Sequence, residues 1–220
     1  MPYARTRSSG RPEAGVRVNL GCGHHTPEGW THVDYALGAR LGRVPLFRYL
    51  NRKLHLFRME WDPEIMIHDL RRRFPFTEGS VDVVYTSHTL EHFLKEEGRA
   101  FLAECRRILR RGGILRVLVP DLRAFIAKYE EGRISADQFI EKLGVLSPPP
   151  RRGWVGRMAG AFTAFPHRCM YDETTLLDRF RELGFEAAPR RPFDSSIDDI
   201  SSIETRGRTV STVIVEGRKL

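Results

Sequence analysis

The residues best suited to chemistry lie in one stretch, VRVNLGCGHHTPEGWTHVD, which runs from Val16 to Asp34. Gly21 and Gly23 follow an apolar run. Glycine adopts backbone angles that are closed to other residues and lets a ligand approach the main chain closely. Asp34 ends a second short strand, where its carboxylate can accept both hydroxyls of a ribose. This arrangement predicts a site for a nucleoside cofactor.

The pattern differs from the fingerprint of a dinucleotide site. The chain has no GxGxxG motif after its first strand, and Asp34 follows the glycine turn too early for a helix that would hold a pyrophosphate. A nicotinamide-dependent dehydrogenase is therefore disfavoured. Because a lone GxG also occurs in ordinary tight turns, the nucleoside site needs support from the rest of the chain.

Three histidines are candidates for acid–base chemistry. His88 and His92 follow a predicted strand over residues 81–86, and His167 ends a long insert. Histidine can take the proton of an alcohol or amine nucleophile. We expect His88 to be the best placed, and on a helix His92 would share its face. For His92 and His167 the alternative is a structural hydrogen bond.

The sequence gives no recognised metal motif. His24 and His25 are adjacent and lack an acid at ligand spacing, which is a poor zinc signature. Cys22, Cys105 and Cys169 are odd in number and far apart, so neither a disulfide framework nor a CxxC site is indicated. We expect no bound metal and a reducing, cytoplasmic location.

Predicted strands and helices alternate in an order that would position these residues. Apolar strands are predicted over residues 65–70, ending near Asp69, over residues 81–86, ahead of Ser87, and up to Val119. A helix is expected before the strand that ends at Val119, and it should end at Gly112 and Gly113. Its buried apolar face would contain Phe101, Cys105 and Ile108. The arginines that lie largely off this face are Arg106, Arg107, Arg110 and Arg111.

The C-terminal part returns to the same alternation. Asp172 is a suitable N-cap, and Gly184 is a suitable stop for a helix whose buried face would contain Leu176, Leu177, Phe180 and Leu183. Strands are expected over residues 185–188 and, at the end of the fold, over residues 209–215. Such alternation favours a mostly parallel α/β sheet.

Taken together, the motifs resemble the class I S-adenosylmethionine-dependent methyltransferases, in particular their small bacterial, type 11-like branch. The motifs that carry the resemblance are NLGCG, the acid of HVD, LEH and LRRGGILRVLVPD, and the resemblance covers residues 16–121 and 167–219. It implies a Rossmann-like α/β fold. The sheet would have seven mostly parallel strands with an antiparallel last strand, and helices would cover both faces.

The same resemblance implies the cofactor, S-adenosylmethionine, with S-adenosylhomocysteine as product. The glycine turn would pass under the methionine part, and Asp34 would hold the ribose. Asp69 and Leu70 would meet the adenine, and Ser87 and His88 would lie beside the sulfonium. Residues implied at the cofactor are Asn19, Gly21, Cys22, Gly23, Asp34, Tyr35, Asp69, Leu70, Ser87 and His88. Because Asn19 stands where an acid is common, we expect modest cofactor affinity.

Length and composition fit one globular domain, because 220 residues with 41% hydrophobic and 29% charged side chains can bury a sizeable core. We expect a disordered basic arm over residues 1–15, which lacks the apolar core of a signal peptide. A single methyltransferase domain would occupy residues 16–220, with inserts at about 36–62 and 122–166. No run approaches the ~18 apolar residues of a membrane span.

The net charge of +8 comes mostly from scattered arginines, but residues 40–58 form one notable basic cluster. There Leu46, Phe47, Leu50, Leu54 and Phe57 would share one helical face, opposite Arg48, Arg52 and His55. Three interpretations are open. The helix packs on the sheet, covers an acidic or phosphate-bearing substrate, or lies on an anionic membrane, which would place the protein at the inner membrane face.

The second insert, residues 122–166, follows the strand that ends at Val119 and is expected at the ligand-binding edge of the sheet. Short helices are predicted over residues 122–131 and 136–143. A long proline, glycine and arginine loop then offers side chains that could stack on and clamp a sugar or phosphate, namely Arg151, Arg152, Trp154 and Arg157. The alternative is an ordinary surface loop.

The expected activity is transfer of a methyl group to an oxygen or nitrogen of a small polar acceptor, such as a sugar or a lipid-linked glycan. The first alternative is an RNA or protein methyltransferase, which the charge invites. Nucleic acid is disfavoured because the chain shows no appended nucleic-acid module and has TSHT where an NPPY-like motif would stand. The second alternative is a non-catalytic, cofactor-binding scaffold. The oligomeric state and the atom methylated do not follow from the fold.

Overall fold

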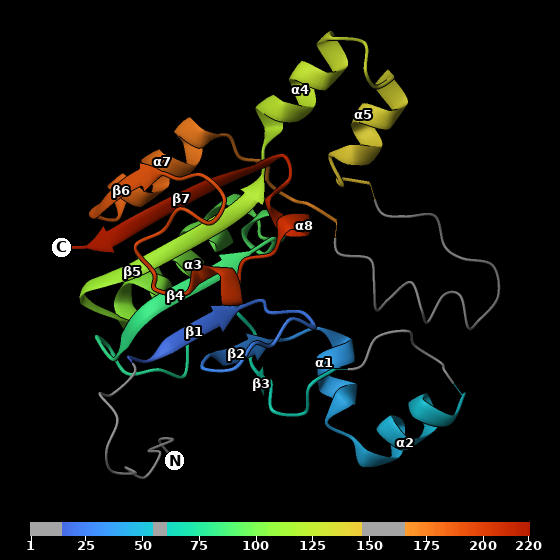
Figure 1. The fold of residues 1–220 in the computed structure, drawn as a ribbon, viewed down its shortest axis with the longest axis vertical. Coiled ribbons are helices and arrows are strands. Elements are labelled where there is room, and N and C mark those ends of the chain that lie inside the picture. The colour runs from blue at the N-terminus through green and yellow to red at the C-terminus, as the bar shows by residue number, and fades with distance from the viewer. Residues whose placement is uncertain (1–14, 55–60, 147–165) are drawn as a thin grey trace.

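A seven-stranded sheet forms the centre of the protein in the computed structural model, which describes residues 15–54, 61–146 and 166–220 (Figure 1). The strand order is β3-β2-β1-β4-β5-β7-β6. Neighbouring strands are parallel, except that β7 runs antiparallel to both β5 and β6. The predicted Rossmann-like sheet is confirmed. The strands are β1 (Arg17–Leu20), β2 (Thr31–Asp34), β3 (Met66–Ile67), β4 (Val81–Ser87), β5 (Leu109–Pro120), β6 (Phe185–Pro189) and β7 (Thr212–Lys219).

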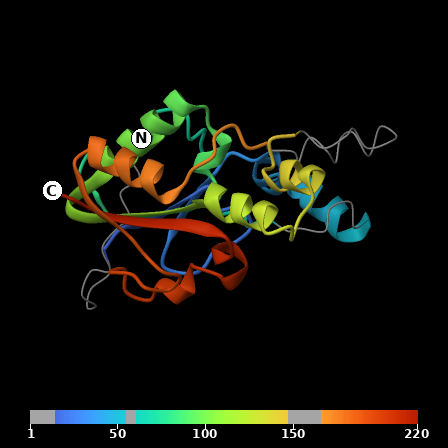
Figure 2. The ribbon, with the colours of Figure 1, turned by 90° about the horizontal axis from the view of Figure 1, so that it is seen from above.

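Helices and turns connect these strands and cover the sheet. Figure 2 shows α3 and α7 on one face, while the chain that contains η2 and α8 crosses the other. The helices are α1 (Leu37–Gly42), α2 (Pro45–Leu54), α3 (Lys95–Ile108), α4 (Leu122–Glu130), α5 (Ala136–Lys142), α7 (Glu173–Glu182) and α8 (Arg206–Thr209), and the 3-10 turns are η1 (Leu90–His92) and η2 (Ile200–Ser202).

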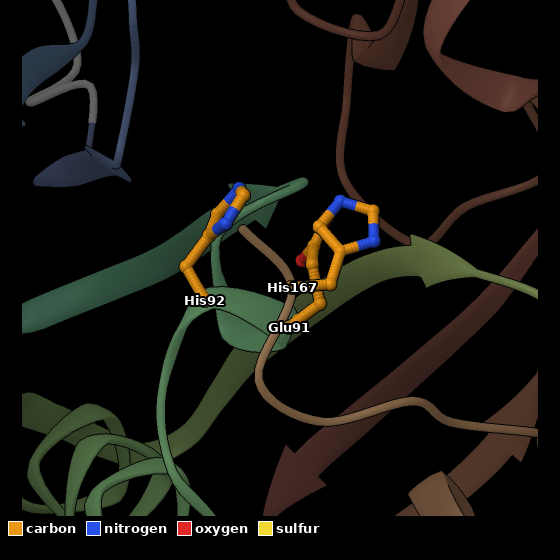
Figure 3. A group of neighbouring side chains, drawn as sticks. All are labelled: Glu91, His92 and His167. Atoms are coloured by element: carbon orange, nitrogen blue, oxygen red, sulfur yellow. The ribbon is translucent and has the colours of Figure 1, made fainter. Parts of the chain in front are cut away.

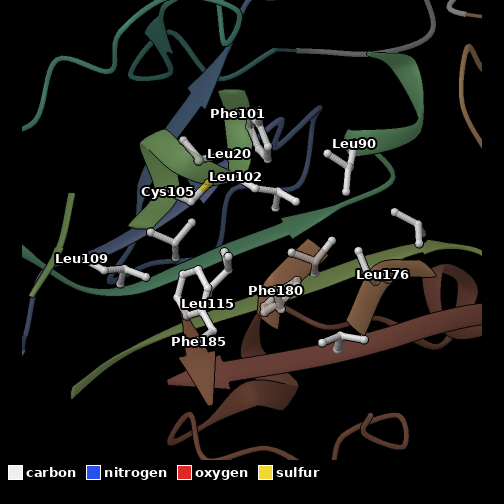
Figure 4. Packing of buried hydrophobic residues seen from close by; sticks show 14 of the residues in the cluster. Leu20, Leu90, Phe101, Leu102, Cys105, Leu109, Leu115, Leu176, Phe180 and Phe185 are labelled. Atoms are coloured by element: carbon white, nitrogen blue, oxygen red, sulfur yellow. The ribbon is translucent and has the colours of Figure 1, made fainter. Parts of the chain in front are cut away.

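The larger part of the core lies between the sheet and helices α3 and α7 (Figure 4). The predicted face of α3 is buried, with Phe101 and Cys105 packed against the strands. On α7, the Asp172 carboxylate accepts the Thr175 N–H at 2.8 Å and caps the helix, as predicted. A second cluster fills the opposite face, where Trp30 and Tyr85 pack under isoleucines from residues 197–203.

The predicted end of the first long helix is wrong. α3 ends before Leu109, and β5 begins there, so Gly112 and Gly113 lie inside the strand. The pairing of β4 with β5 changes register at this point. Gly112 has φ +76°, and a Cβ on Gly113 would lie 2.9 Å from the Arg110 carbonyl oxygen. The two glycines therefore permit a bulge and do not terminate a helix.

Two predicted strands also have different bounds. The strand predicted over residues 65–70 is reduced to two residues, because the chain turns at Asp69, whose carboxylate accepts the Arg71 N–H. The final strand begins at Thr212 and not at Thr209, which ends α8. Ser211, with φ +55°, makes the turn between them. The predicted strand over residues 185–188 is confirmed as β6.

The apolar face of α2 is only partly covered. Leu46, Tyr49 and Leu50 are 66%, 55% and 38% exposed, and in Figure 1 the helix extends away from the sheet. Phe47 on the same face is half-buried, so the described part of this face is only partly packed. None of the helices among the described residues is both long and apolar enough to cross a membrane.

The second insert begins as predicted, with α4 and α5 after β5. Several predictions fall outside the described residues: the arm over residues 1–15 apart from Gly15, the helical face at Phe57, and the clamp made by Arg151, Arg152, Trp154 and Arg157.

Candidate active site

The glycine turn after β1 has the predicted backbone geometry. Gly21 and Gly23 have φ of +69° and +59°, in the left-handed region that favours glycine. The Gly21 N–H donates to the Val33 carbonyl at 2.8 Å, which ties the turn to β2. A Cβ on Gly21 would lie only 2.1 Å from Thr89 Oγ1, in the segment after β4. The turn is therefore packed closely between two strand ends.

Asp34 is buried at the end of β2, next to this turn. Its Oδ2 accepts the Gly23 N–H at 2.8 Å and its Oδ1 accepts the Ala36 N–H at 2.7 Å. Because each carboxylate oxygen can accept more than one hydrogen bond, ribose hydroxyls can still be bound. The position and chemistry of Asp34 thus fit the ribose of the expected cofactor.

Asn19 and Cys22 are both buried in the same region. The Asn19 amide donates to the His25 carbonyl at 3.3 Å and contacts His32 Nδ1 at 3.3 Å, while His32 Nε2 donates to the Pro27 carbonyl at 2.9 Å. Burial lowers the pKa of His32 and favours its neutral form. Burial likewise raises the pKa of the Cys22 thiol. Neutral side chains therefore order this loop.

The residues expected at the adenine lie beyond β2 and β3. Asp69 forms a two-bond ion pair with Arg71, with both distances 2.9 Å, and the hydrogen bond from Arg71 lowers the pKa of the Asp69 carboxyl. Leu70 is buried. Tyr35 is partly exposed, with the Arg40 guanidinium 5.2 Å from its ring centre. The Asp69 carboxylate is thus already paired with an arginine, while Tyr35 offers an exposed aromatic surface.

His88 follows Ser87, which is buried at the end of β4. His88 has φ +53° and lies before η1, so the prediction that His88 and His92 share a helical face is wrong. Burial lowers the pKa of His88, but the Glu91 carboxylate, 3.3 Å from Nδ1, and the Arg208 carbonyl, 3.0 Å from Nε2, raise it more. The net pKa lies above the ordinary value. Both ring nitrogens face acceptors, which favours the doubly protonated ring.

Arg208 is a residue of this site that sequence reasoning missed. Its Nη1 donates to the Ser87 carbonyl at 3.4 Å, and its Nη2 lies 3.3 Å from where a Cβ on Gly23 would be. A positive charge therefore lies beside the glycine turn. The sequence offered no signal for it, because residue 208 is far from both segments along the chain and lies in a region predicted only as the approach to a strand.

His92 and His167 come together from distant segments, with ring centres 5.1 Å apart (Figure 3). His92 Nδ1 lies 3.4 Å from the Pro166 carbonyl oxygen. His167 Nδ1 donates to the Leu143 carbonyl at 2.7 Å, and burial lowers the pKa of His167. Both histidines thus contact backbone carbonyls from the second insert and its end.

A cavity of about 230 Å³ lies beside the glycine loop. Its lining includes His24 and Thr26 from the loop, Arg48 and Asn51 from α2, and Asp62. The cavity lies between the predicted cofactor loop and the basic helix α2, and its lining is mostly polar.

Residues 42–117, about a third of the chain, match the family model described as a methyltransferase domain. No curated protein matches the chain. Among solved structures, the YcgJ protein from Bacillus subtilis aligns over 94% of this chain and 92% of its own, with 13% identity and a TM-score of 0.50. At this identity the likeness shows the fold alone.

Two further structures come from Burkholderia thailandensis. An O-methyltransferase family protein has 15% identity and a TM-score of 0.49, and the alignment covers 93% of this chain and 51% of that protein. A didemethyltoxoflavin methyltransferase with bound S-adenosylhomocysteine has 14% identity and a TM-score of 0.48, over 93% and 71% of the two chains. The chain thus spans about half the length of some structures that it matches.

The sheet thus has the predicted Rossmann-like order, and its central part matches the methyltransferase domain model. The positive-φ glycine turn and the Asp34 carboxylate bonded to it lie where the resemblance implies S-adenosylmethionine.

Proposed function

We propose that the protein transfers the methyl group of S-adenosylmethionine to an oxygen or nitrogen of a small polar acceptor, such as a sugar or a lipid-linked glycan. The observation that carries the proposal is the closely packed glycine turn with the Asp34 carboxylate hydrogen-bonded to it, beside Ser87 at the end of β4. These groups lie at the carboxyl ends of β1, β2 and β4, where α/β sheets bind ligands.

The bound cofactor supplies an activated methyl group on a sulfonium, so the protein mainly has to hold the acceptor near and in line. The backbone of Gly21, Cys22 and Gly23 would run along the methionine part. Arg208 would attract its carboxylate, because the guanidinium lies beside that turn. Asp34 would accept the ribose hydroxyls. Further residues on or after these strands and β3 complete the proposed site: Asn19 and Tyr35, Asp69 and Leu70 at the adenine, and Ser87 with His88 at the sulfonium.

One of three histidines would remove the proton from the acceptor. His88 holds acceptors at both ring nitrogens, so it would have to release a contact before acting as a base. His167 donates through Nδ1 and therefore keeps the lone pair on Nε2. His92 lies beside it. We keep His88 as the first candidate for the base because it lies at the end of β4, with His92 and His167 as the alternatives.

The acceptor class follows from charge and from the resemblance, since the cavity beside the loop includes Arg48 from the basic helix. A cationic lining favours an acceptor that carries phosphate or another acid. An RNA or protein substrate and a non-catalytic scaffold are the rival functions.

Isothermal titration calorimetry with S-adenosylmethionine, S-adenosylhomocysteine and NAD tests the cofactor site. We expect binding of the first two and not of NAD. Asp34→Asn should weaken binding about 10- to 100-fold, because it removes charged hydrogen bonds to the ribose. Asp178→Asn changes an exposed acid on α7 and should bind like the wild type.

Circular dichroism of Asp34→Asn separates loss of binding from loss of folding, since Asp34 also holds the turn. Absence of binding by the wild type would remove the enzymatic proposal and leave the scaffold function. Tighter binding to RNA at low salt would instead favour an RNA substrate.

We also propose that α2 touches an anionic membrane at its cytoplasmic face. The helix exposes Leu46, Tyr49 and Leu50 beside the exposed basic residues Arg52 and Lys53. An exposed apolar face with adjacent cations suits the boundary between headgroups and acyl chains. Such contact would bring a lipid-linked acceptor to the cavity beside this helix.

Co-sedimentation with vesicles that contain phosphatidylserine tests this contact. We expect binding at low salt that falls as ionic strength rises, because screening weakens the attraction of the cations to the lipid. The double variant Leu46→Ser, Leu50→Ser should bind several-fold less. Leu94→Ser replaces a leucine of similar exposure away from α2 and serves as control. Equal sedimentation of both variants would contradict the proposal.

A further inference from the structure

A compact group of three metal-ligating side chains lies beside the proposed cofactor site. Glu91 and His92 come from η1, and His167 comes from the segment before α7 (Figure 3). One ligand atom from each residue lies within 4.8 Å of the other two. His167 Nε2 is 4.0 Å from Glu91 Oε1. The three side chains thus face one small volume.

The Glu91 carboxylate is fully buried, and its Oε2 has no hydrogen-bond partner within the described part of the structure. The nearest positive group is His88, whose Nδ1 lies 3.3 Å from Oε1. A buried carboxylate is costly unless it is paired and hydrogen-bonded on all sides. His88 meets only Oε1, so among the described residues Oε2 lacks a compensating charge.

The surrounding backbone holds the ligands in place. His167 Nδ1 donates to the Leu143 carbonyl at 2.7 Å, which directs the lone pair of Nε2 toward Glu91. A carbonyl on the second ring nitrogen is the usual way that proteins orient a metal-binding histidine. The Glu91 carbonyl accepts the N–H groups of Arg168 and Cys169, at 2.8 and 3.1 Å, and so fixes the two segments together.

We propose that Glu91, His92 and His167 bind a divalent first-row transition metal ion, for which Zn²⁺ is the natural probe. Two imidazoles and one carboxylate form a known zinc ligand set, and with three protein ligands a fourth position stays open for water or an acceptor oxygen. Ligand atoms around tetrahedral zinc are about 3.3 Å apart, given bonds of about 2.0–2.1 Å. Small rotations of the three side chains would close the present separations.

Such an ion would join the end of the second insert to the turn after β4. It would also place a positive charge next to Ser87 and His88. The site does not depend on the methyltransferase proposal, because each of its ligands is defined by contacts with other parts of the chain.

The test is zinc binding by untagged full-length protein that has first been treated with a chelator. Calorimetry and elemental analysis should give one Zn²⁺ per chain. Glu91→Gln and His167→Gln should each weaken binding at least tenfold. His24→Gln removes an exposed histidine elsewhere and should bind like the wild type. The readout is metal content, so its result is separate from that of the cofactor titration.

Histidine-labelled NMR of the wild type gives an answer even where a variant fails to fold. The ring nitrogens of two histidines should shift on addition of one equivalent of Zn²⁺, and His92→Gln should remove one of these signals. Absence of stoichiometric binding by the wild type would overturn the proposal. Equal affinity in the wild type, Glu91→Gln and His167→Gln would overturn it as well.

Discussion

The contacts around the glycine turn explain the residue types at particular positions, which the family pattern alone does not. Gly21 is needed twice over, because its φ is positive and because Thr89 occupies the space of a side chain. Asn19, which replaces a common acid, has a role of its own, since it bridges the turn to neutral His32. The turn is therefore held by packing and neutral hydrogen bonds, with Asp34 as the charged group that faces it.

Gly21→Ala should destabilise the protein more than Gly29→Ala. Both glycines have positive φ, but a Cβ on Gly29 would meet nothing within 4 Å. Gly29→Ala should cost about 1 kcal/mol for the backbone conformation alone. Gly21→Ala adds displacement of Thr89 and should cost about 2–4 kcal/mol in all. Urea denaturation measures the free energy of unfolding of both variants. Equal losses would contradict the prediction, because they would mean that Thr89 moves aside at no energetic cost.

At the scale of elements, a buried ion triad joins β5 and β7 to the segment that covers the sheet. Arg116 on β5 has no exposed surface and pairs with Glu204 at 2.8 Å and with Glu216 at 3.0 Å. Its remaining N–H groups donate to the carbonyls of Asp194 and Arg191. This triad anchors the segment that leads to Arg208 and hence to the proposed cofactor site.

Arg116→Met should lower the free energy of unfolding by about 3–5 kcal/mol, because two buried carboxylates would lose their partner. Arg110→Met is the matched control, since Arg110 pairs with Asp82 at a half-exposed position on the same strand. Its loss should be below about 1 kcal/mol. Urea denaturation at neutral pH compares the two. A small loss for Arg116→Met would mean that the neighbouring carboxyls take up protons or that water enters.

At the scale of the whole molecule, the site gathers segments from most of the chain around the carboxyl end of β4. The glycine turn reaches it from β1 and residues 87–92 follow the strand itself. His167 arrives after the second insert, and Arg208 arrives from the segment before β7. The two candidate ligand sites, for cofactor and for metal, therefore share η1 and its approach. We expect a substitution in one site to alter ligand binding at the other.

Features that depend on neighbours along the chain could be predicted from the sequence. The positive-φ turn, Asp34 at a strand end, the buried face of α3 and the Asp172 cap were all predicted because each follows from local spacing. The predicted helix end at Gly112 was wrong because glycine occurs in β-bulges as well as at helix ends, and local spacing does not distinguish the two.

Contacts between residues far apart along the chain could not be predicted in this way. His88 and Arg208 are 120 positions apart, and Arg116 and Glu216 are 100 apart. The metal ligands lie in segments more than seventy residues apart, so a search for adjacent ligands could not reveal them. The exposed face of α2 is equally a tertiary outcome, because periodicity shows that a helix is amphipathic but not what covers it. Such contacts depend on how the sheet orders its strands, and no single segment encodes that order.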